Sequence, residues 1–232
     1  MRGIGSGPWS TAVANAMGDP LAIGPARFRH ATAPEDVDTV YLGAFARSRY
    51  IAIGGYRTFP SGTVEDADFY ARWRAAGGIV RVDPSLRSWY HPRETWRAMW
   101  RQYLRYGRGK AELVWVNGRL PSWRPLAPAV LVAALTVSGV VAIIGPPLPL
   151  AIVAGSWAVA VLAVALRAPS RRLRTAAAVA TMHLAYGTGL WAGLLSGRPH
   201  VVTIGMEAAT DEDLSRPGST DPKREVGPSE PS

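Results

Sequence analysis

Three carboxylates, Glu65, Asp66 and Asp68, stand at the start of a segment that predicts a short helix within residues 62–78. Acidic side chains in the first turn of a helix interact favourably with its macrodipole. The apolar residues that follow recur at three- and four-residue spacing, which predicts one buried face: Phe69, Tyr70, Trp73 and Ala76. Asp66 precedes this face by one turn, where an accessible carboxylate could act as a general base and accept a proton from a hydroxyl group.

A structural interpretation of the same acid stays open. Thr63 and Asp66 have the spacing of a capping box, in which the acid only satisfies free backbone groups at the helix start. The local pattern favours capping over catalysis, and only the surroundings of the helix can change that balance.

A second group of polar residues, Gln102, Arg105 and Tyr106, lies in a helix predicted from Thr95 to about Trp115. Aromatic and basic residues alternate along this helix, as they do in helices that lie in a membrane interface. A solvated basic helix packed on its own domain is an equally good interpretation. We expect Gly107 and Gly109 to break or bend the helix.

The elements before residue 92 alternate between short helices and short strands. We predict helices over 10–17 and 47–53, and Gly54-Gly55 ends the second one. Strands are predicted over 38–45, where a glycine turn begins, over 79–82 and over 87–90. Residues 56–62 are expected to form a loop and residues 83–85 a turn.

Three long runs without Lys, Arg, Asp or Glu follow, at about 125–144, 148–166 and 175–195. Each has about the 20 residues that a membrane-spanning helix needs. Arginines lie before the first run and in the segment 167–174, so the positive-inside rule places residues 1–124 and this segment in the cytoplasm. Three spans would put the acidic, proline-rich tail outside, and its composition predicts disorder. His183 in the third run is expected to be a packed or hydrogen-bonded residue.

The composition limits the class of protein. The 232 residues contain no cysteine, which excludes disulfides and cysteine-based zinc sites, and their net charge is +9. The basic residues concentrate before position 125 and in residues 167–174, beside apolar runs, which favours membrane lipids over nucleic acid as the partner.

The motifs, taken in order and followed by the apolar runs, resemble the carboxy-terminal half of membrane-bound family 2 glycosyltransferases, particularly the type that builds bacterial exopolysaccharide such as succinoglycan. The resemblance covers roughly residues 10–196 and rests on these motifs: Asp38, Gly43-Ala44-Phe45, Gly54-Gly55, Glu65-Asp66-x-Asp68, Gly77-Gly78 and Gln102-x-x-Arg105-Tyr106.

The resemblance implies an α/β partial GT-A domain followed by an all-α membrane region of three transmembrane helices. Its parts would be a catalytic, acceptor-side domain over 1–92, an amphipathic interfacial region over 93–124, the three spans within 125–196 and a disordered tail over 197–232. It also implies a multi-pass protein of the cell membrane with its catalytic part in the cytoplasm. The partners would be a nucleotide-sugar donor, a saccharide or lipid-linked acceptor, and membrane lipids.

The resemblance also assigns roles to residues. Asp66 would be the base that deprotonates the acceptor hydroxyl, with Glu65 as its neighbour. Gln102, Arg105 and Tyr106 match the family's Gln-x-x-Arg-Trp motif, with tyrosine in place of tryptophan, and would lie near the acceptor and the donor diphosphate. The remaining substrate-binding candidates are Asp38, Gly43, Ala44, Phe45 and Asp68.

One family motif is missing from its expected place. Family members carry an Asp-x-Asp that holds Mg²⁺ or Mn²⁺, and the only such spacing before Glu65, Asp36-Val37-Asp38, is interpreted as acceptor-side. His91 is a weak metal candidate. We therefore expect a truncated chain whose complete enzyme uses a divalent metal, and a separate amino-terminal half would then be a partner. The alternative is a non-catalytic membrane remnant or accessory subunit.

Overall fold

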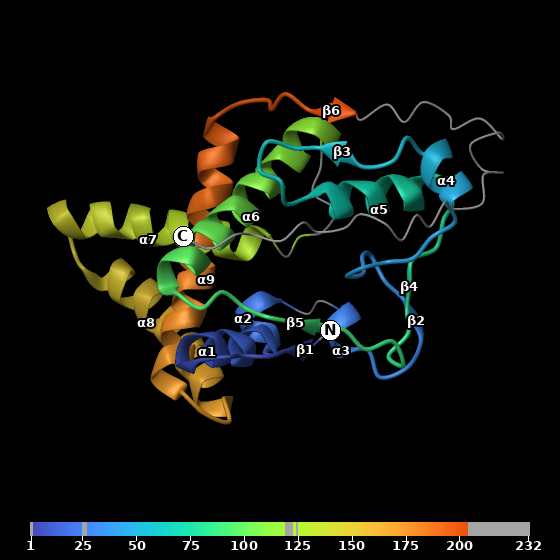
Figure 1. Cartoon of the computed structure of the whole chain (residues 1–232). Coiled ribbons are helices and arrows are strands. Elements are labelled where there is room, and N and C mark those ends of the chain that lie inside the picture. The colour runs from blue at the N-terminus through green and yellow to red at the C-terminus, as the bar shows by residue number, and fades with distance from the viewer. Residues whose placement is uncertain (1, 25–26, 119–122, 124, 204–232) are drawn as a thin grey trace, which may run out of the picture.

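The computed structural model describes residues 2–24, 27–118, 123 and 125–203, and within them the chain is mostly helical (Figure 1). The strands in these residues are two residues long and form three separate pairs. β1 (Arg2–Gly3) pairs with β5 (Trp89–Tyr90) in parallel, and β2 (Glu35–Asp36) pairs with β4 (Arg81–Val82) in antiparallel orientation. The sequence predicted an α/β domain, and the structure shows helices with only very short strands. The expected GT-A fold is not confirmed.

The centre of the molecule is the long helix α9 (Arg172–Leu195), which packs along α6 (Trp96–Asn117). The helices α1 (Pro8–Met17), α2 (Pro20–Ile23) and α8 (Leu148–Arg167) close around them. One apolar core joins all five: Val13, Ala16, Met17, Ala22, Met99, Val164, Ala178, Val179 and Met182. The predicted helix over 10–17 is confirmed, and it belongs to the same core as the apolar helices.

The helix α6 is continuous from Trp96 to Asn117, so Gly107 and Gly109, which were expected to break or bend it, do not break it. Both glycines serve close packing instead. A Cβ on Gly107 would collide with the backbone of Tyr186 in α9, and one on Gly109 would collide with the loop before α5. The arginines of α6, Arg97, Arg101, Arg105 and Arg108, are exposed. The helix therefore packs on α9 with its arginines exposed.

A smaller aromatic core holds α4 (Arg47–Ala52) and α5 (Glu65–Ala75) together. Phe69 of α5 is fully buried, and the rings of Phe45, Tyr50 and Tyr56 lie 4.9 to 5.3 Å from it. The helix α4 ends before Gly54 and Gly55, which have φ angles of 83° and 61°, so the predicted glycine stop is confirmed.

Two of the strand predictions are wrong in position. Residues 38–45 form no strand, and the extended pair lies earlier, at β2. The strand predicted over 79–82 is limited to β4. The expected loop over 56–62 contains β3 (Arg57–Thr58), which pairs with β6 (Val202–Thr203) from the other end of the described chain. The helix α3 (Arg27–His30) was not predicted.

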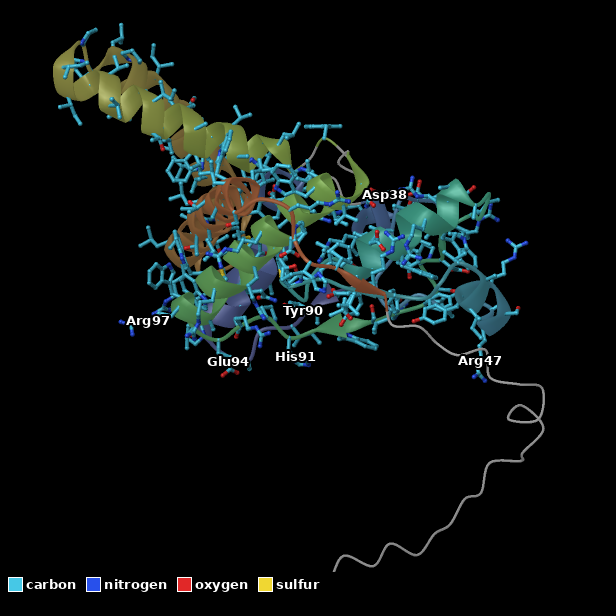
Figure 2. All side chains as sticks on the ribbon, turned by 90° about the horizontal axis from the view of Figure 1, so that it is seen from above. Asp38, Arg47, Tyr90, His91, Glu94 and Arg97 are labelled. Atoms are coloured by element: carbon cyan, nitrogen blue, oxygen red, sulfur yellow. The ribbon has the colours of Figure 1, made fainter. Side chains whose placement is uncertain are left out.

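The helices α7 (Leu126–Ile144) and α8 form a hairpin that projects from the rest of the molecule (Figures 1 and 2). Both are long and apolar enough to cross a membrane, by length and composition alone. The third expected span falls in α9, which is not among the helices of the described residues that meet this test. A three-span region is therefore not confirmed. The expected tail lies outside the described residues from position 204 onward.

Candidate functional site

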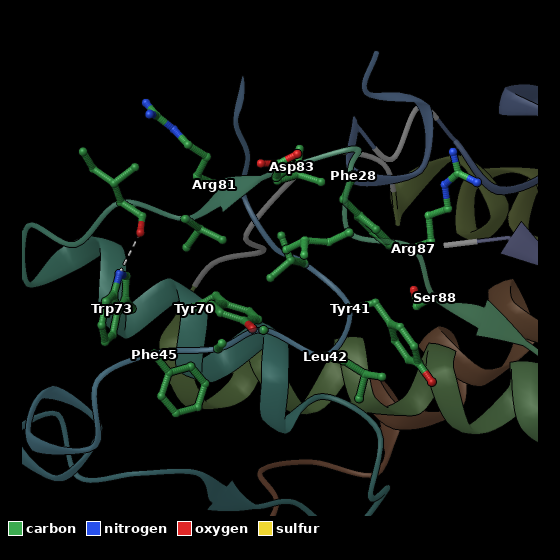
Figure 3. Close-up of a pocket in the computed structure, with 17 residues that line it drawn as sticks. Phe28, Tyr41, Leu42, Phe45, Tyr70, Trp73, Arg81, Asp83, Arg87 and Ser88 are labelled. Atoms are coloured by element: carbon green, nitrogen blue, oxygen red, sulfur yellow. Dashed lines mark hydrogen bonds between the residues drawn. The ribbon is translucent and has the colours of Figure 1, made fainter. Parts of the chain in front are cut away.

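A pocket of about 460 Å³ lies between the segment 40–45, α5 and the turn that follows β4. Figure 3 shows Tyr70, Phe45 and Leu42 on one wall and Phe28, Arg81 and Asp83 on the other. The structure thus brings three predicted residues, Gly43, Ala44 and Phe45, to one cavity. Its aromatic walls and scattered polar groups suit a sugar-sized ligand.

Gly43 and Tyr70 fix the shape of this pocket. A Cβ on Gly43 would collide with the hydroxyl of Tyr70, so only glycine allows this approach of the backbone to the ring. Burial raises the pKa of Tyr70 to about 12, and the negative charge of Asp66 contributes to the increase. Tyr70 therefore keeps its proton at neutral pH and can donate a hydrogen bond.

Asp66 is exposed in the first turn of α5, one turn before Tyr70. Its Oδ1 accepts a hydrogen bond of 2.7 Å from the backbone N–H of Ala67. Its charge also raises the pKa of Tyr56, for which burial is the larger cause. Asp66 is not a lining residue of the pocket, but it lies beside the tyrosine that forms its wall.

The capping-box interpretation of Asp66 is wrong. The N-cap of α5 is Val64 and not Thr63, and the Val64 side chain forms no capping hydrogen bond. The hydroxyl of Thr63 donates instead to Ser61 Oγ at 3.1 Å and to the backbone oxygen of Arg105 at 3.3 Å. The carboxylate of Asp66 nevertheless satisfies one first-turn backbone group, the N–H of Ala67.

Asp68 and Glu65 have different surroundings. The side chain of Asp68 is fully buried and forms an ion pair of 2.8 Å with Arg72, and Asn117 donates to it at 3.4 Å. Arg72 also donates to the carbonyls of Ile53 and Gly55, which attaches α5 to the turn after α4. Asp68 therefore holds the helix in place, although sequence reasoning assigned it to the substrate. Glu65 is partly exposed beside Asp66.

Gln102 and Tyr106 belong to one hydrogen-bonded group on α6. The side-chain amide of Gln102 donates to Tyr106 at 2.7 Å and to Tyr90 at 2.9 Å. Burial raises the pKa of Tyr106 to about 12, so this hydroxyl stays protonated at neutral pH. The bond from Thr63 to the Arg105 backbone connects this group to the start of α5. The structure therefore places the two predicted motifs on neighbouring elements, while the side chain of Arg105 is exposed.

Asp38 and His91 lie apart from each other. Figure 2 shows Asp38 on the opposite side of the body from His91. Neither residue lines the pocket of about 460 Å³. Within the residues that the structure describes, no group of three or more His, Asp or Glu side chains could hold a metal ion.

Sequence reasoning missed several residues of this region. Leu42 has a φ of 53°, a left-handed conformation that is rare for a non-glycine residue and is often found at functional sites. Nothing in its residue type indicates this. Tyr70 was expected only to be buried, although its position four residues after Asp66 places both on one side of the helix. Arg87 and Phe28 come from segments where no site was expected.

A comparison with known proteins finds that the sequence is similar to a protein of polysaccharide biosynthesis. The chain is 28% identical over 208 residues to the succinoglycan biosynthesis protein ExoA of Rhizobium meliloti (strain 1021), a match that covers 87% of this chain and 61% of that protein. This similarity supports a distant relationship to exopolysaccharide biosynthesis proteins, and the chain spans less than two thirds of the length of this relative. No family model and no solved structure matches the chain.

Proposed function

We propose that this chain carries the acceptor side of a glycosyltransferase of exopolysaccharide synthesis. The observation that carries the proposal is the position of Asp66, an exposed carboxylate beside the Tyr70 wall of a sugar-sized pocket. The similarity to a succinoglycan biosynthesis protein supports the same class of reaction.

In the proposed reaction Asp66 accepts the proton of an acceptor hydroxyl as its oxygen attacks the anomeric carbon of a nucleotide-sugar. The bond from that carbon to the diphosphate oxygen breaks, and the nucleoside diphosphate leaves with the electron pair. One displacement of this kind inverts the anomeric carbon. A carboxylate is required because a sugar hydroxyl is a poor nucleophile until its proton is removed in the transition state.

A divalent metal would assist departure of the diphosphate in a complete enzyme. The described residues do not offer a donor set for such an ion. We therefore assign no step of the reaction to a metal held by this part of the chain.

The test is the release of nucleoside diphosphate from nucleotide-sugars by the longest reading frame that contains this chain, purified in detergent, with and without Mg²⁺ or Mn²⁺. We expect Asp66→Asn to lower turnover by about 10²- to 10⁴-fold, the usual contribution of a general base. Glu94→Gln is the control, because this exposed acid bonds only to Ser6 among the interactions of the described residues. Wild-type turnover in Asp66→Asn would show that the base is another residue.

We further propose that the α7–α8 hairpin anchors the protein in a cell membrane, with the catalytic body on the cytoplasmic side. The support is the exposure of large aliphatic side chains along both helices, including Val137, Ile143, Ile144 and Ile152. Monomeric soluble proteins rarely expose apolar surface of this extent.

A further inference from the structure

A second pocket, of about 230 Å³, adjoins the first and is strongly basic. Three arginines line it, Arg2, Arg29 and Arg87, and Asp83 is its one acidic lining residue. Phe28, Arg87 and Ser88, which Figure 3 shows at one end of the first pocket, line both pockets. A ligand in the first pocket can therefore extend into the second.

Arg29 is the most enclosed of the three arginines. Burial lowers its pKa, and electrostatic interaction with Tyr103, Tyr106 and Tyr90 partly offsets that effect. Within the part of the chain that the structure describes, no carboxylate forms an ion pair with Arg29. A guanidinium that has lost water without gaining an anionic partner carries a desolvation cost, which an anionic ligand would offset.

The charges around the pocket indicate which anion would fit. Asp83 is ionised, because the backbone N–H of Ser85 donates to it at 2.8 Å and lowers its pKa. Three guanidinium groups and one carboxylate leave a net charge of 3 − 1 = +2. This charge complements a doubly charged phosphate or diphosphate better than a single carboxylate, and guanidinium groups bind phosphate oxygens in bidentate pairs.

We propose that the pocket formed by Arg2, Arg29 and Arg87 binds a diphosphate group, on a ligand whose saccharide occupies the neighbouring aromatic pocket. The identity of that ligand rests on the proposed function, whereas the anion site rests on the arginines alone. The diphosphate can come from a lipid-linked acceptor or from a nucleotide donor, because both present the same chemical group to the arginines.

The first experiment titrates inorganic pyrophosphate into the purified full chain in detergent and metal-free buffer, measured by calorimetry. We expect Arg29→Gln to raise Kd at least about tenfold, which corresponds to ~1.4 kcal/mol. Arg74→Gln is the matched control, because Arg74 is an exposed arginine of α5 that lines neither pocket, and its Kd should stay within about twofold. An unchanged Kd in Arg29→Gln, or equal losses in both variants, would overturn the proposal.

A second variant covers the case in which Arg29→Gln does not fold, which circular dichroism would reveal. Arg87 is exposed at the boundary of the two pockets, so Arg87→Gln should fold normally and still raise Kd several-fold. Wild-type affinity in this variant would overturn the site. Glucuronate serves as a carboxylate probe, and binding of glucuronate in preference to pyrophosphate would contradict the assignment to diphosphate.

Further titrations distinguish the sources of the group. Farnesyl diphosphate that binds more tightly than uridine diphosphate, with the same dependence on Arg29, would assign the site to a lipid-linked ligand, and the reverse order would assign it to the donor. Asp66→Asn should bind pyrophosphate like the wild type. If the proposed function is wrong, the protein will show no turnover but will still bind pyrophosphate. If the anion site is wrong, binding of pyrophosphate will not depend on Arg29.

Discussion

The helix pair α7–α8 and the helix α9 all contain long runs without Lys, Arg, Asp or Glu, yet the structure gives them different surroundings. Only 11% of the residues in the apolar windows of α7 and of α8 are buried within the protein. In α9 the buried residues continue from one end to the other: Thr175, Ala178, Val179, Thr181, Met182, Ala185, Gly187, Gly189 and Leu190. This difference agrees with composition, because among the described helices α7 and α8 are apolar enough to cross a membrane and α9 is not.

The contacts at the two ends of α9 explain the difference. Before it, the side chain of Asn15 in α1 donates to the backbone of Ser170 at 2.9 Å. After it, β6 pairs with β3, and Val201 packs on a core that contains Phe59 and Leu113. Both ends of α9 thus contact the same body. If the α7–α8 hairpin enters the bilayer as proposed, these contacts keep the two ends of α9 on the same side of the membrane as the body.

The polar residues of α9 agree with a position inside the protein. His183 accepts a hydrogen bond from Trp157 at its Nδ1, so its Nε2 carries the proton that is donated to the carbonyl of Ala22. The sequence-based expectation of a hydrogen-bonded histidine is confirmed. These bonds connect α8, α9 and α2, and they belong to the packing of the body.

The largest expected effect is an all-or-none result in membrane topology. The chain has no cysteine, so single cysteines can be introduced at Ser170 and Ser196, one on each side of α9. If α9 stays with the body, a membrane-impermeant maleimide will label both positions from the same side of oriented vesicles. Labelling of Ser170→Cys and Ser196→Cys from opposite sides would establish a third span instead.

The second prediction compares glycines in the two regions. A Cβ on Gly189 in α9 would collide with the backbone of Leu104 in α6, whereas one on Gly155 in α8 would meet nothing within 4 Å. We expect Gly189→Ala to lower the free energy of unfolding by about 1–3 kcal/mol, because α6 must move away. Gly155→Ala should raise it by up to about 1 kcal/mol through helix propensity. Thermal unfolding of both variants in detergent measures the difference, and equal stabilities would contradict the tight α6–α9 contact.

The smallest effect concerns the junction between the hairpin and the body. Arg167 at the end of α8 donates to both oxygens of Asp19, the N-cap residue of α2, at 2.9 and 3.0 Å. Because Arg167 is about half exposed, we expect Arg167→Gln to lower the free energy of unfolding by only about 0.5–1 kcal/mol. The loss should shrink at high salt, which screens the pair. An effect that does not depend on salt would show that packing dominates this contact.

Local features of the site were predictable from the sequence. The first-turn acids of α5, the glycine stop after α4 and the Thr95 start of α6 depend on residues only a few positions apart. The sequence could not predict that Asp66 is exposed whereas Asp68 is buried. These two acids lie two residues apart, and which one is buried depends on Arg72 and on the distant Asn117.

The sequence by itself determined that a carboxylate pair begins the helix α5, that α6 is basic and aromatic, and that apolar helices follow. Periodicity, caps and hydropathy are short-range properties, so they can be read along the chain. Only the tertiary structure decided that Tyr70 meets Gly43, that Arg29 lies near tyrosines and that α9 packs along α6. These contacts join residues that are far apart in the sequence, so local sequence patterns cannot predict them.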